Sequence, residues 1–357
     1  MNIREPSDTF MKRTNLTDFT LSQLTDFVKN LGLPTYRGRQ IFAWLYRPNI
    51  SDFSQMTDLT KDLREKLASH ATFHWPEIAN VERSKDGTVK YGFRLKDNNY
   101  IESVLIPEDG RNTLCVSSQV GCAMGCEFCL TGGMGFKRNL TPGEMLGQVV
   151  KVRDWLYDEE DNKSVLNNLV FMGMGEPLAN FDNLLIALEI LTDQRGLNFS
   201  DRRITVSTCG LVPKIMELGQ KSRVNLAVSL HSVDDSVRSR LMPINSKYPV
   251  AELLDACKTF PMPKRKRIMF EYILIKDLND SVSDAEVLAE RLRDIPCKIN
   301  LLPYNETGDL PFQRPSDKKI ELFQKTLWKE GYTVLIRSSR GSDISAACGQ
   351  LAGKMSL

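Results

Sequence analysis

The chain has 357 residues, 41% of them hydrophobic and 26% charged, with a net charge of +2 and an isoelectric point near 8.0. This ordinary composition and length suit a globular protein with one large domain and one smaller one. The chain has no run of eighteen apolar residues and no signal-peptide core, which argues against a membrane protein and predicts a cytoplasmic location, while the small net charge leaves nucleic-acid binding open.

Three short amphipathic helices are predicted near the N-terminus, over about 20–31, 35–46 and 58–68. The first begins at a capping box, Thr20-Leu-Ser-Gln23. The aromatic and basic stretch 36–39 could either face RNA or form a solvated helix start, and composition favours neither. We predict a helical accessory domain over residues 1–75.

Residues 76–110 are predicted to form a β-hairpin extension. Apolar residues alternate with polar ones from about Ile78 to Ile106, and Asp86-Gly87 is typical of a tight hairpin turn. Glu102 lies on the same face as Val104 and other apolar residues. A carboxylate in that position either pairs with a cation or has a raised pKa that suits a general base, unless the strand edge faces water.

Strand-like and helix-like stretches then alternate over residues 111–340, which we predict to be the core domain. This alternation predicts a parallel sheet that is curved into an open or closed barrel. The number of units is too small for a complete eightfold barrel, so we expect an incomplete (β/α)6 barrel of the TIM type. The chemistry of such folds lies at the C-terminal ends of the strands.

Three of the eight cysteines lie in one short loop, Cys122-Ala-Met-Gly-Cys126-Glu-Phe-Cys129. An iron–sulfur cubane used only for electron transfer normally has four cysteine ligands, so three ligands would leave one iron open to a small molecule. A structural zinc site usually has four protein ligands, and no second cysteine pair follows at a suitable distance. We rank an open cluster first, zinc second and unligated thiols third.

Glycines and small polar residues follow several predicted strands. Glycines allow the backbone to approach a ligand closely, and Glu176 could hold a cationic amine. The residues at these strand ends are Gly175 and Glu176, Ser207, Ser229 to His231, and Asn305. Each alone is more often a turn or a cap, but together beside the cysteine loop they predict a site for a molecule with a ribose, a carboxylate and an adenine.

The C-terminal segment 341–357 contains one cysteine, Cys348, between small residues. A thiol in such a segment can act as a covalent carrier, or it can be inert like the predicted core cysteines Cys257 and Cys297. Cys115, in the first core strand, is either a buried thiol or a partner of Cys348 in a transient disulfide.

The three-cysteine spacing resembles that of the radical S-adenosylmethionine enzymes, and much more of the chain resembles one branch, the RlmN/Cfr family of RNA methyltransferases. The matching stretches run along nearly the whole chain: Gly-Leu-Pro-Thr-Tyr-Arg (32–37), Gly-Cys-Ala-Met-Gly-Cys-Glu-Phe-Cys (121–129), Met-Gly-Met-Gly-Glu-Pro-Leu (172–178), Leu-Ala-Val-Ser-Leu-His (226–231), Leu-Met-Pro-Ile-Asn (241–245), Asn-Leu-Leu-Pro-Tyr-Asn (300–305) and Gly-Ser-Asp-Ile-Ser-Ala-Ala-Cys-Gly-Gln-Leu (341–351). The cluster motif indicates only the superfamily, whereas the motif around Cys348 indicates the RNA-methylating branch.

The resemblance implies a role for each of these residues. One [4Fe–4S] cluster per chain would have three ligands, Cys122, Cys126 and Cys129, and its open iron would bind S-adenosylmethionine. The cofactor would be lined by Gly175, Glu176, Ser207, Ser229, Leu230, His231 and Asn305. Two S-adenosylmethionine molecules would be used per turnover, one to methylate Cys348 and one to form the radical that activates that methyl group.

The resemblance also implies that the helical domain over residues 1–75 binds RNA, and it implies the later steps of the reaction. The activated methylene would add to carbon 2 of an adenine, Cys115 would resolve the crosslink as a disulfide with Cys348, and Glu102 would accept the proton. The expected substrate is 23S rRNA at the peptidyl transferase centre, with the adenosine 3′ of the anticodon in some tRNAs as a second substrate. A flavodoxin or ferredoxin would donate electrons to a monomeric enzyme.

Three other readings stay open on the sequence. A Cfr-like enzyme that methylates carbon 8 of the same adenine would share the cluster and both thiols. A non-catalytic RNA-binding protein with a structural metal would not need Cys348. A radical enzyme acting on a small metabolite would not need a methyl carrier either.

Overall fold

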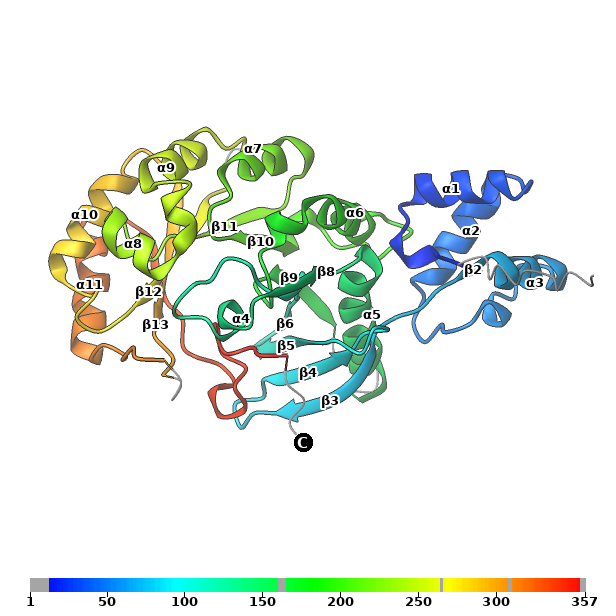
Figure 1. The fold of residues 1–357 in the computed structure, drawn as a ribbon, viewed down its shortest axis with the longest axis horizontal. Helices are drawn as coiled ribbons and strands as arrows, with labels where there is room; N and C mark the ends of the chain where they lie inside the picture. The colour runs from blue at the N-terminus through cyan, green and yellow to red at the C-terminus, as the bar shows by residue number, and fades with distance from the viewer. Residues whose placement is uncertain (1–12, 160–164, 264–265, 307–309, 354–357) are drawn as a thin grey trace, which may run out of the picture.

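A computed structural model describes residues 13–159, 165–263, 266–306 and 310–353. A group of N-terminal helices lies to one side of a larger α/β core, and the C-terminal segment runs beside that core (Figure 1). Residues 1–12 and 354–357 of the predicted terminal segments lie outside the described residues. None of the described helices is long and apolar enough to cross a membrane.

Seven parallel strands form the core of the main sheet: β6 (Arg111–Cys115), β9 (Leu166–Phe171), β10 (Ile204–Thr208), β11 (Asn225–Ser229), β12 (Ile268–Leu274), β13 (Cys297–Pro303) and β14 (Val334–Ile336). Three antiparallel strands extend it, β3 (Glu77–Arg83), β4 (Val89–Arg94) and β5 (Tyr100–Glu108). The strand order β14-β13-β12-β11-β10-β9-β6-β5-β4-β3 ends at β14 on one side and at β3 on the other. The described sheet is therefore open, and the prediction of an incomplete barrel is confirmed.

Helices connect the parallel strands because a parallel pair needs a long crossover. They are α5 (Pro142–Glu159), α6 (Phe181–Thr192), α7 (Val212–Lys221), α8 (Asp235–Leu241), α9 (Val250–Thr259), α10 (Val282–Leu292) and α11 (Asp317–Lys329). Side-chain caps fix several of the starts. The hydroxyl of Ser281 accepts from the Asp284 backbone N–H while the Asp284 carboxylate accepts from the Ser281 N–H, which is a capping box at α10.

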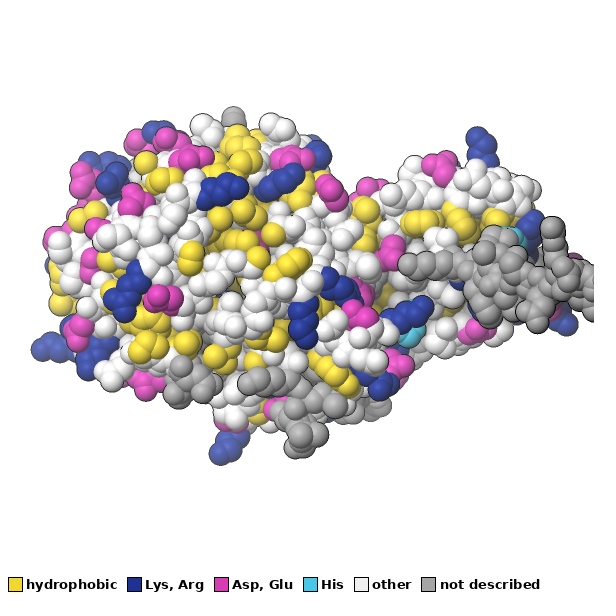
Figure 2. Space-filling model, viewed as in Figure 1, with side chains coloured by type: hydrophobic (Ala, Val, Ile, Leu, Met, Phe, Trp, Pro, Cys, Tyr) yellow, Lys and Arg dark blue, Asp and Glu magenta, His cyan; other side chains and the backbone are white. Residues whose placement is uncertain are grey.

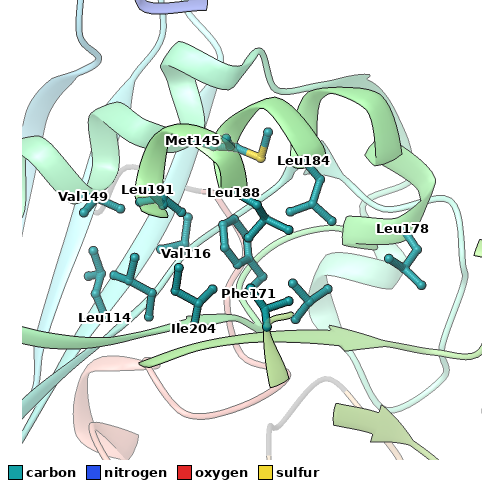
Figure 3. Packing of buried hydrophobic residues seen from close by; sticks show 14 of the residues in the cluster. Leu114, Val116, Met145, Val149, Phe171, Leu178, Leu184, Leu188, Leu191 and Ile204 are labelled. Carbon is teal, nitrogen blue, oxygen red and sulfur yellow. The ribbon is translucent and has the colours of Figure 1, made fainter. Parts of the chain in front are cut away.

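Apolar side chains of the sheet pack against α5 and α6. Figure 3 shows Leu114 of β6, Phe171 of β9 and Ile204 of β10 facing Val149 of α5 and Leu188 of α6. All five are buried, and burying one such side chain contributes about 1.5–3 kcal/mol relative to leaving it in water. This packing fixes the strand ends, and therefore the loops after them, relative to one another.

The N-terminal helices are α1 (Leu21–Asn30), α2 (Tyr36–Leu45) and α3 (Lys61–His70), with a small parallel pair, β1 (Thr14–Asn15) and β2 (Ala71–Thr72). The predicted capping box at the start of α1 is present. The third helix starts later than predicted because the Thr60 hydroxyl caps it by accepting from the Leu63 N–H. The Tyr36 side chain is exposed, with the Arg37 guanidinium 4.9 Å from the centre of its ring.

The predicted hairpin extension is part of the main sheet. β4 pairs with both β3 and β5, and β5 pairs in turn with β6. The pattern of the sequence identified the alternation, but it gave no indication that the hairpin and the barrel share one set of hydrogen bonds. As a result, any side chain on β4 or β5 is held rigidly relative to the first core strand.

The distribution of charged side chains on the surface agrees with the small net charge of the chain. In the face shown in Figure 2, Lys and Arg side chains alternate with Asp and Glu side chains around the edge of the core. Hydrophobic side chains gather over the middle of the same face. No single-sign field dominates this view, so binding of a polyanion at this face would depend on a few local cations.

Candidate active site

One cavity of about 190 Å³ lies at the C-terminal ends of the core strands. Six of the eight cysteines line it: Cys115, Cys122, Cys126, Cys129, Cys209 and Cys348. Of the predicted cofactor residues, all but one also line it: Gly175, Glu176, Ser207, Ser229, His231 and Asn305. Sequence positions more than 200 residues apart therefore share one small space, as expected for a site at the C-terminal ends of barrel strands.

The three-cysteine loop follows a short hairpin strand, β7 (Gln119–Gly121), which pairs with β8 (Phe136–Asn139). Gly121 has φ +73°, and a Cβ there would collide with the carbonyl oxygen of Gly135, so only glycine fits. The loop is held at several backbone positions. The Cys122 N–H donates to Gly135 O at 3.0 Å, and the Leu130 N–H, one residue after Cys129, donates to Gly349 O at 2.8 Å.

The three loop thiols are largely shielded from water. Burial raises the pKa of Cys122 to about 11 and also raises the pKa values of Cys126 and Cys129 above their usual range. These thiols are therefore protonated at neutral pH until a cation binds them, and binding would release protons.

The donor set fits an iron–sulfur cluster. Three thiols that face one cavity are soft ligands of the kind that iron–sulfur clusters use. Among the described residues, no three His, Cys, Asp or Glu side chains are grouped tightly enough to bind one metal ion. A cubane binds each thiolate at a separate iron, so it suits a looser arrangement than a single zinc ion does.

Glu176 is buried at the end of the loop that follows β9. Its two carboxylate oxygens accept from the backbone N–H groups of Leu178 at 2.9 Å and Cys209 at 2.8 Å. Burial still raises the pKa of Glu176 above its usual value, because these hydrogen bonds only partly offset desolvation. Gly175, with φ +96°, precedes it, and a Cβ at Gly175 would collide with the side chain of Gln119.

His231 is a buried imidazole at the end of β11. Burial, and then the nearby charge of Arg238, lower the pKa of His231 to about 3, so the ring is neutral at physiological pH. The Ile273 N–H donates to its Nδ1 at 3.0 Å, which assigns the proton to Nε2. The ring also makes an edge contact with Phe128 of the cysteine loop, with centroids 4.8 Å apart.

Leu230 and Glu102 are the two predicted site residues that do not line the cavity. The Leu230 side chain is fully buried, its N–H donates to Glu271 O, and its carbonyl accepts from Arg238 Nε. Glu102 is buried and lies 3.6 Å from Lys90 Nζ. In this structure Glu102 therefore pairs with a cation and lies outside the cavity.

Cys115 and Cys348 both line the cavity and are free thiols in the structure. Burial, with a smaller effect from Cys348, raises the pKa of Cys115 to about 12. Arg337 lines the same cavity as both thiols, and the pKa of its guanidinium is raised, chiefly by the charge of Cys348.

Three polar residues of the site were not identified from the sequence. Arg238 is fully buried and donates to the carbonyls of Cys209, Ser229 and Leu230 and to Asn245, so it fixes the ends of β10 and β11. Glu271 lines the cavity with 4% of its surface exposed and accepts from Asn300 at 3.0 Å. Arg337 is the third. A charged residue inside the apolar strand run 268–275 was the signal for Glu271, as it was for Glu102.

Known proteins resemble the chain over nearly its whole length. Residues 14–73 match the family model for the ribosomal RNA large subunit methyltransferase N-terminal domain, and residues 116–289 match the radical SAM superfamily. The protein named dual-specificity RNA methyltransferase RlmN from Desulfotalea psychrophila is 54% identical over 354 residues, covering 98% of both chains. The protein of the same name from Geobacter sulfurreducens is 51% identical, covering 96% of this chain and 92% of its own length.

Among solved structures, a radical SAM methyltransferase from Sphaerobacter thermophilus superposes with a TM-score of 0.89 at 45% identity, covering 96% of this chain and all of that one. The similarity therefore includes the N-terminal helices and the extension as well as the barrel.

Proposed function

The chain belongs to the RlmN family of radical S-adenosylmethionine RNA methyltransferases, and from that premise we propose how its own residues divide the reaction. Enzymes of this family use a [4Fe–4S] cluster and S-adenosylmethionine, and their substrate is RNA. One observation carries the proposal: the three-cysteine loop, Cys115 and Cys348 all face a single cavity.

The proposed substrates are an adenine of 23S rRNA, at the peptidyl transferase centre, and the adenosine 3′ of the anticodon in some tRNAs. The relatives are named dual-specificity RNA methyltransferases, and the N-terminal family model refers to large-subunit ribosomal RNA. Carbon 2 of adenine lies between two ring nitrogens and has no nucleophilic lone pair, so a polar methyl transfer has no route to it. Such a target base has to leave its stack to reach an enclosed cavity.

In this proposal Cys122, Cys126 and Cys129 hold one cluster, and the strand-end residues hold the cofactor. When bound there, the reduced cluster and S-adenosylmethionine would supply a radical able to remove a hydrogen atom from a methyl group on Cys348. Glu176, oriented by two backbone N–H groups, presents a carboxylate to a cationic amine, and the Nε2–H of His231 is left free to donate into the cavity. Ser207, Ser229 and Asn305 add hydroxyl and amide groups along the same edge, and the buried Leu230 shapes the end of β11.

Cys348 carries the methyl group, and Cys115 releases the product. The methylene radical on Cys348 adds to carbon 2, and the adduct has to give up one electron, which the bound cluster would accept. The Cys115 thiol then loses its proton and attacks the sulfur of Cys348, so that an S–S bond forms and the bond between that sulfur and the RNA-linked carbon breaks. The electron pair passes to that carbon, which takes a proton and becomes the methyl group. Once the methylene has joined carbon 2, Glu102 exchanges its contacts with Lys90, Ala352 and Gly353 for the base and accepts the proton that carbon 2 loses. The resulting disulfide has to be reduced by a thiol reductant before the next turnover. The electrons that reduce the cluster come from a flavodoxin or ferredoxin in the cytoplasm. The enzyme acts as a monomer.

The test is methylation by the purified, reconstituted enzyme with rRNA and tRNA fragments side by side. Nucleosides are then analysed by mass spectrometry against 2-methyladenosine and 8-methyladenosine standards. We expect 2-methyladenosine in both RNAs and none with the Cys348→Ala variant. The 8-methyl product would replace the carbon-2 assignment with the carbon-8 alternative, and product from the Cys348→Ala variant would overturn the carrier role.

A further inference from the structure

The segment that carries Cys348 has little regular structure of its own. Residues 341–353, which we call the cysteine segment, contain only one 3₁₀ turn, η6 (Ser342–Ile344). Gly341 and Ser345 on either side of the turn have left-handed backbone conformations, with φ +64° and +52°. The position of Cys348 therefore depends on what the segment contacts.

The first contact is with the turn between β3 and β4, which lies beside the red C-terminal segment in Figure 1. The Ser84 hydroxyl donates to one carboxylate oxygen of Asp343 at 2.6 Å, and the Lys85 N–H donates to the other at 3.2 Å. The Gly341 N–H in turn donates to Asp86 at 3.0 Å. These bonds fix the start of the cysteine segment at an exposed edge of the extension.

The second contact is buried. Lys90 of β4 and Glu102 of β5 are only 6% and 5% exposed, and Lys90 Nζ lies 3.6 Å from Glu102 Oε1. The Lys90 ammonium donates to the carbonyl of Ile344 at 2.7 Å. The other Glu102 oxygen accepts from the backbone N–H groups of Ala352 at 2.8 Å and Gly353 at 3.1 Å.

This ion pair is therefore hydrogen-bonded to the cysteine segment on both sides of Cys348. The residues between the two points of attachment are 345–351, with Cys348 in the middle. Their other side is bound to the helix after the cluster loop, since the Leu130 N–H donates to Gly349 O and the Thr131 hydroxyl donates to Leu351 O at 2.6 Å. The extension and the cluster loop thus hold the carrier thiol between them.

A purely structural role for the pair in the sheet leaves these contacts unexplained. The main-chain register pairs Lys90 with Val104 and Glu102 with Gly92, so the sheet would form without either charge. Burying two charges is costly unless their remaining hydrogen-bonding capacity is also used. Apart from the 3.2 Å contact of Lys90 with Glu82, the side-chain contacts of the pair beyond the pair itself go to the cysteine segment.

We propose that Lys90, through its ion pair with Glu102, is a positioning residue that fixes Cys348 at the cavity during methyl transfer. The inference rests on the proposed carrier role of Cys348. Lys90 does not touch the reacting atoms. It acts through the backbone of Ile344 and by neutralising the carboxylate that binds Ala352 and Gly353.

The test compares the full-length enzyme with Lys90→Met, with the charge-retaining Lys90→Arg, and with Lys96→Met as a matched control. Lys96 is an exposed lysine of the same extension. The first readout is amide hydrogen exchange of residues 341–353. We expect exchange at Ala352 and Gly353 to become about tenfold faster in Lys90→Met, which corresponds to the loss of about one charge-assisted hydrogen bond. Lys90→Arg should largely restore protection because a guanidinium can make the same contacts.

The second readout is coupling, measured as methylated RNA formed per S-adenosylmethionine cleaved. Lys90→Met should lower this ratio about tenfold while cleavage itself continues, and Lys96→Met should change neither. A ratio that matches the wild-type value in Lys90→Met would overturn the positioning role, and unchanged exchange would overturn the attachment itself.

Two checks keep these outcomes separate from other failures. Since Lys90→Met leaves a buried carboxylate without its cation, the double variant Lys90→Met/Glu102→Gln repeats the exchange experiment without an unpaired charge, and wild-type protection in it would count against the proposal. If the wild-type enzyme made no methylated RNA at all, the proposed function would fail. The exchange experiment would still test whether the Lys90–Glu102 pair holds the cysteine segment.

Discussion

The two ends of the barrel hold chemically similar cysteines in different surroundings. At the C-terminal end of the strands six thiols line one cavity, whereas Cys257 in α9 and Cys297 at the start of β13 are packed in the core. Burial raises the pKa of Cys257 and of Cys297 to about 12, as it does for Cys115. The pKa therefore does not separate Cys115, the proposed resolving thiol, from the two core thiols. Access to a shared cavity does.

The largest expected effect is the loss of a cluster ligand. Cys126→Ala should abolish the brown colour and the cluster absorbance of the reconstituted enzyme and bring methylation below detection, since two thiolates cannot replace three. Cys257→Ala is the matched control at the other end of the barrel. It should keep cluster and activity and cost only about 1–2 kcal/mol of stability, as a typical core truncation does. Equal cluster content in the two variants would show that Cys126 is no more a cluster ligand than the core thiol Cys257 is.

The next effect is on product release. Cys115→Ala should leave the methylene bridge unresolved, so that the purified variant carries RNA attached through Cys348, visible as a mass shift on the peptide that contains that residue. Cys297→Ala, which alters another buried thiol with a similar pKa, should be purified without RNA. A Cys115→Ala protein free of RNA after incubation with substrate would exclude the resolving role.

A third comparison uses glycines. An added Cβ would collide with Gln119 at Gly175, and at Gly219 of α7 it would lie 2.6 Å from Pro261. Both replacements by alanine should cost about 1–3 kcal/mol, measured by chemical denaturation. Only Gly175→Ala should also weaken S-adenosylmethionine binding, measured by equilibrium dialysis, because Gly219 lies at the end of α7 that precedes β11, away from the cavity. Equal loss of binding in both would show that the cavity responds to any loss of stability.

The smallest expected effect is a pH dependence of stability. The pKa of His231 is lowered to about 3 from 6.5, so between these values the unfolded chain binds more protons than the folded one. The contribution of the neutral His231 to the free energy of unfolding is fully present well above pH 6.5. It is lost as the pH falls, by about 1.4 kcal/mol at pH 5.5. Denaturation curves at pH 7.5 and 5.5 should show this loss, and His231→Asn should reduce it.

The sequence by itself determined the local features of the protein. The capping box at Thr20, the alternation of strands with helices and the three-cysteine loop are each set within a few residues, and each is present in the structure. Family membership was also accessible, because the motifs extend along the chain. These features depend on short spacings that hydrogen-bond periodicity and turn geometry impose.

Only the tertiary structure decided what the same residues contact. Glu102 binds backbone groups 250 and 251 positions away, and Lys90 binds one 254 positions away, which no periodicity encodes. Cys209 and Leu230 show the same limit, since the first lines the cavity without a motif to mark it and the second is buried behind it. The physical reason is that curvature of the sheet brings the strand ends together, so that packing over the whole barrel, and not local sequence, places Cys348 between the cluster loop and the Lys90–Glu102 pair.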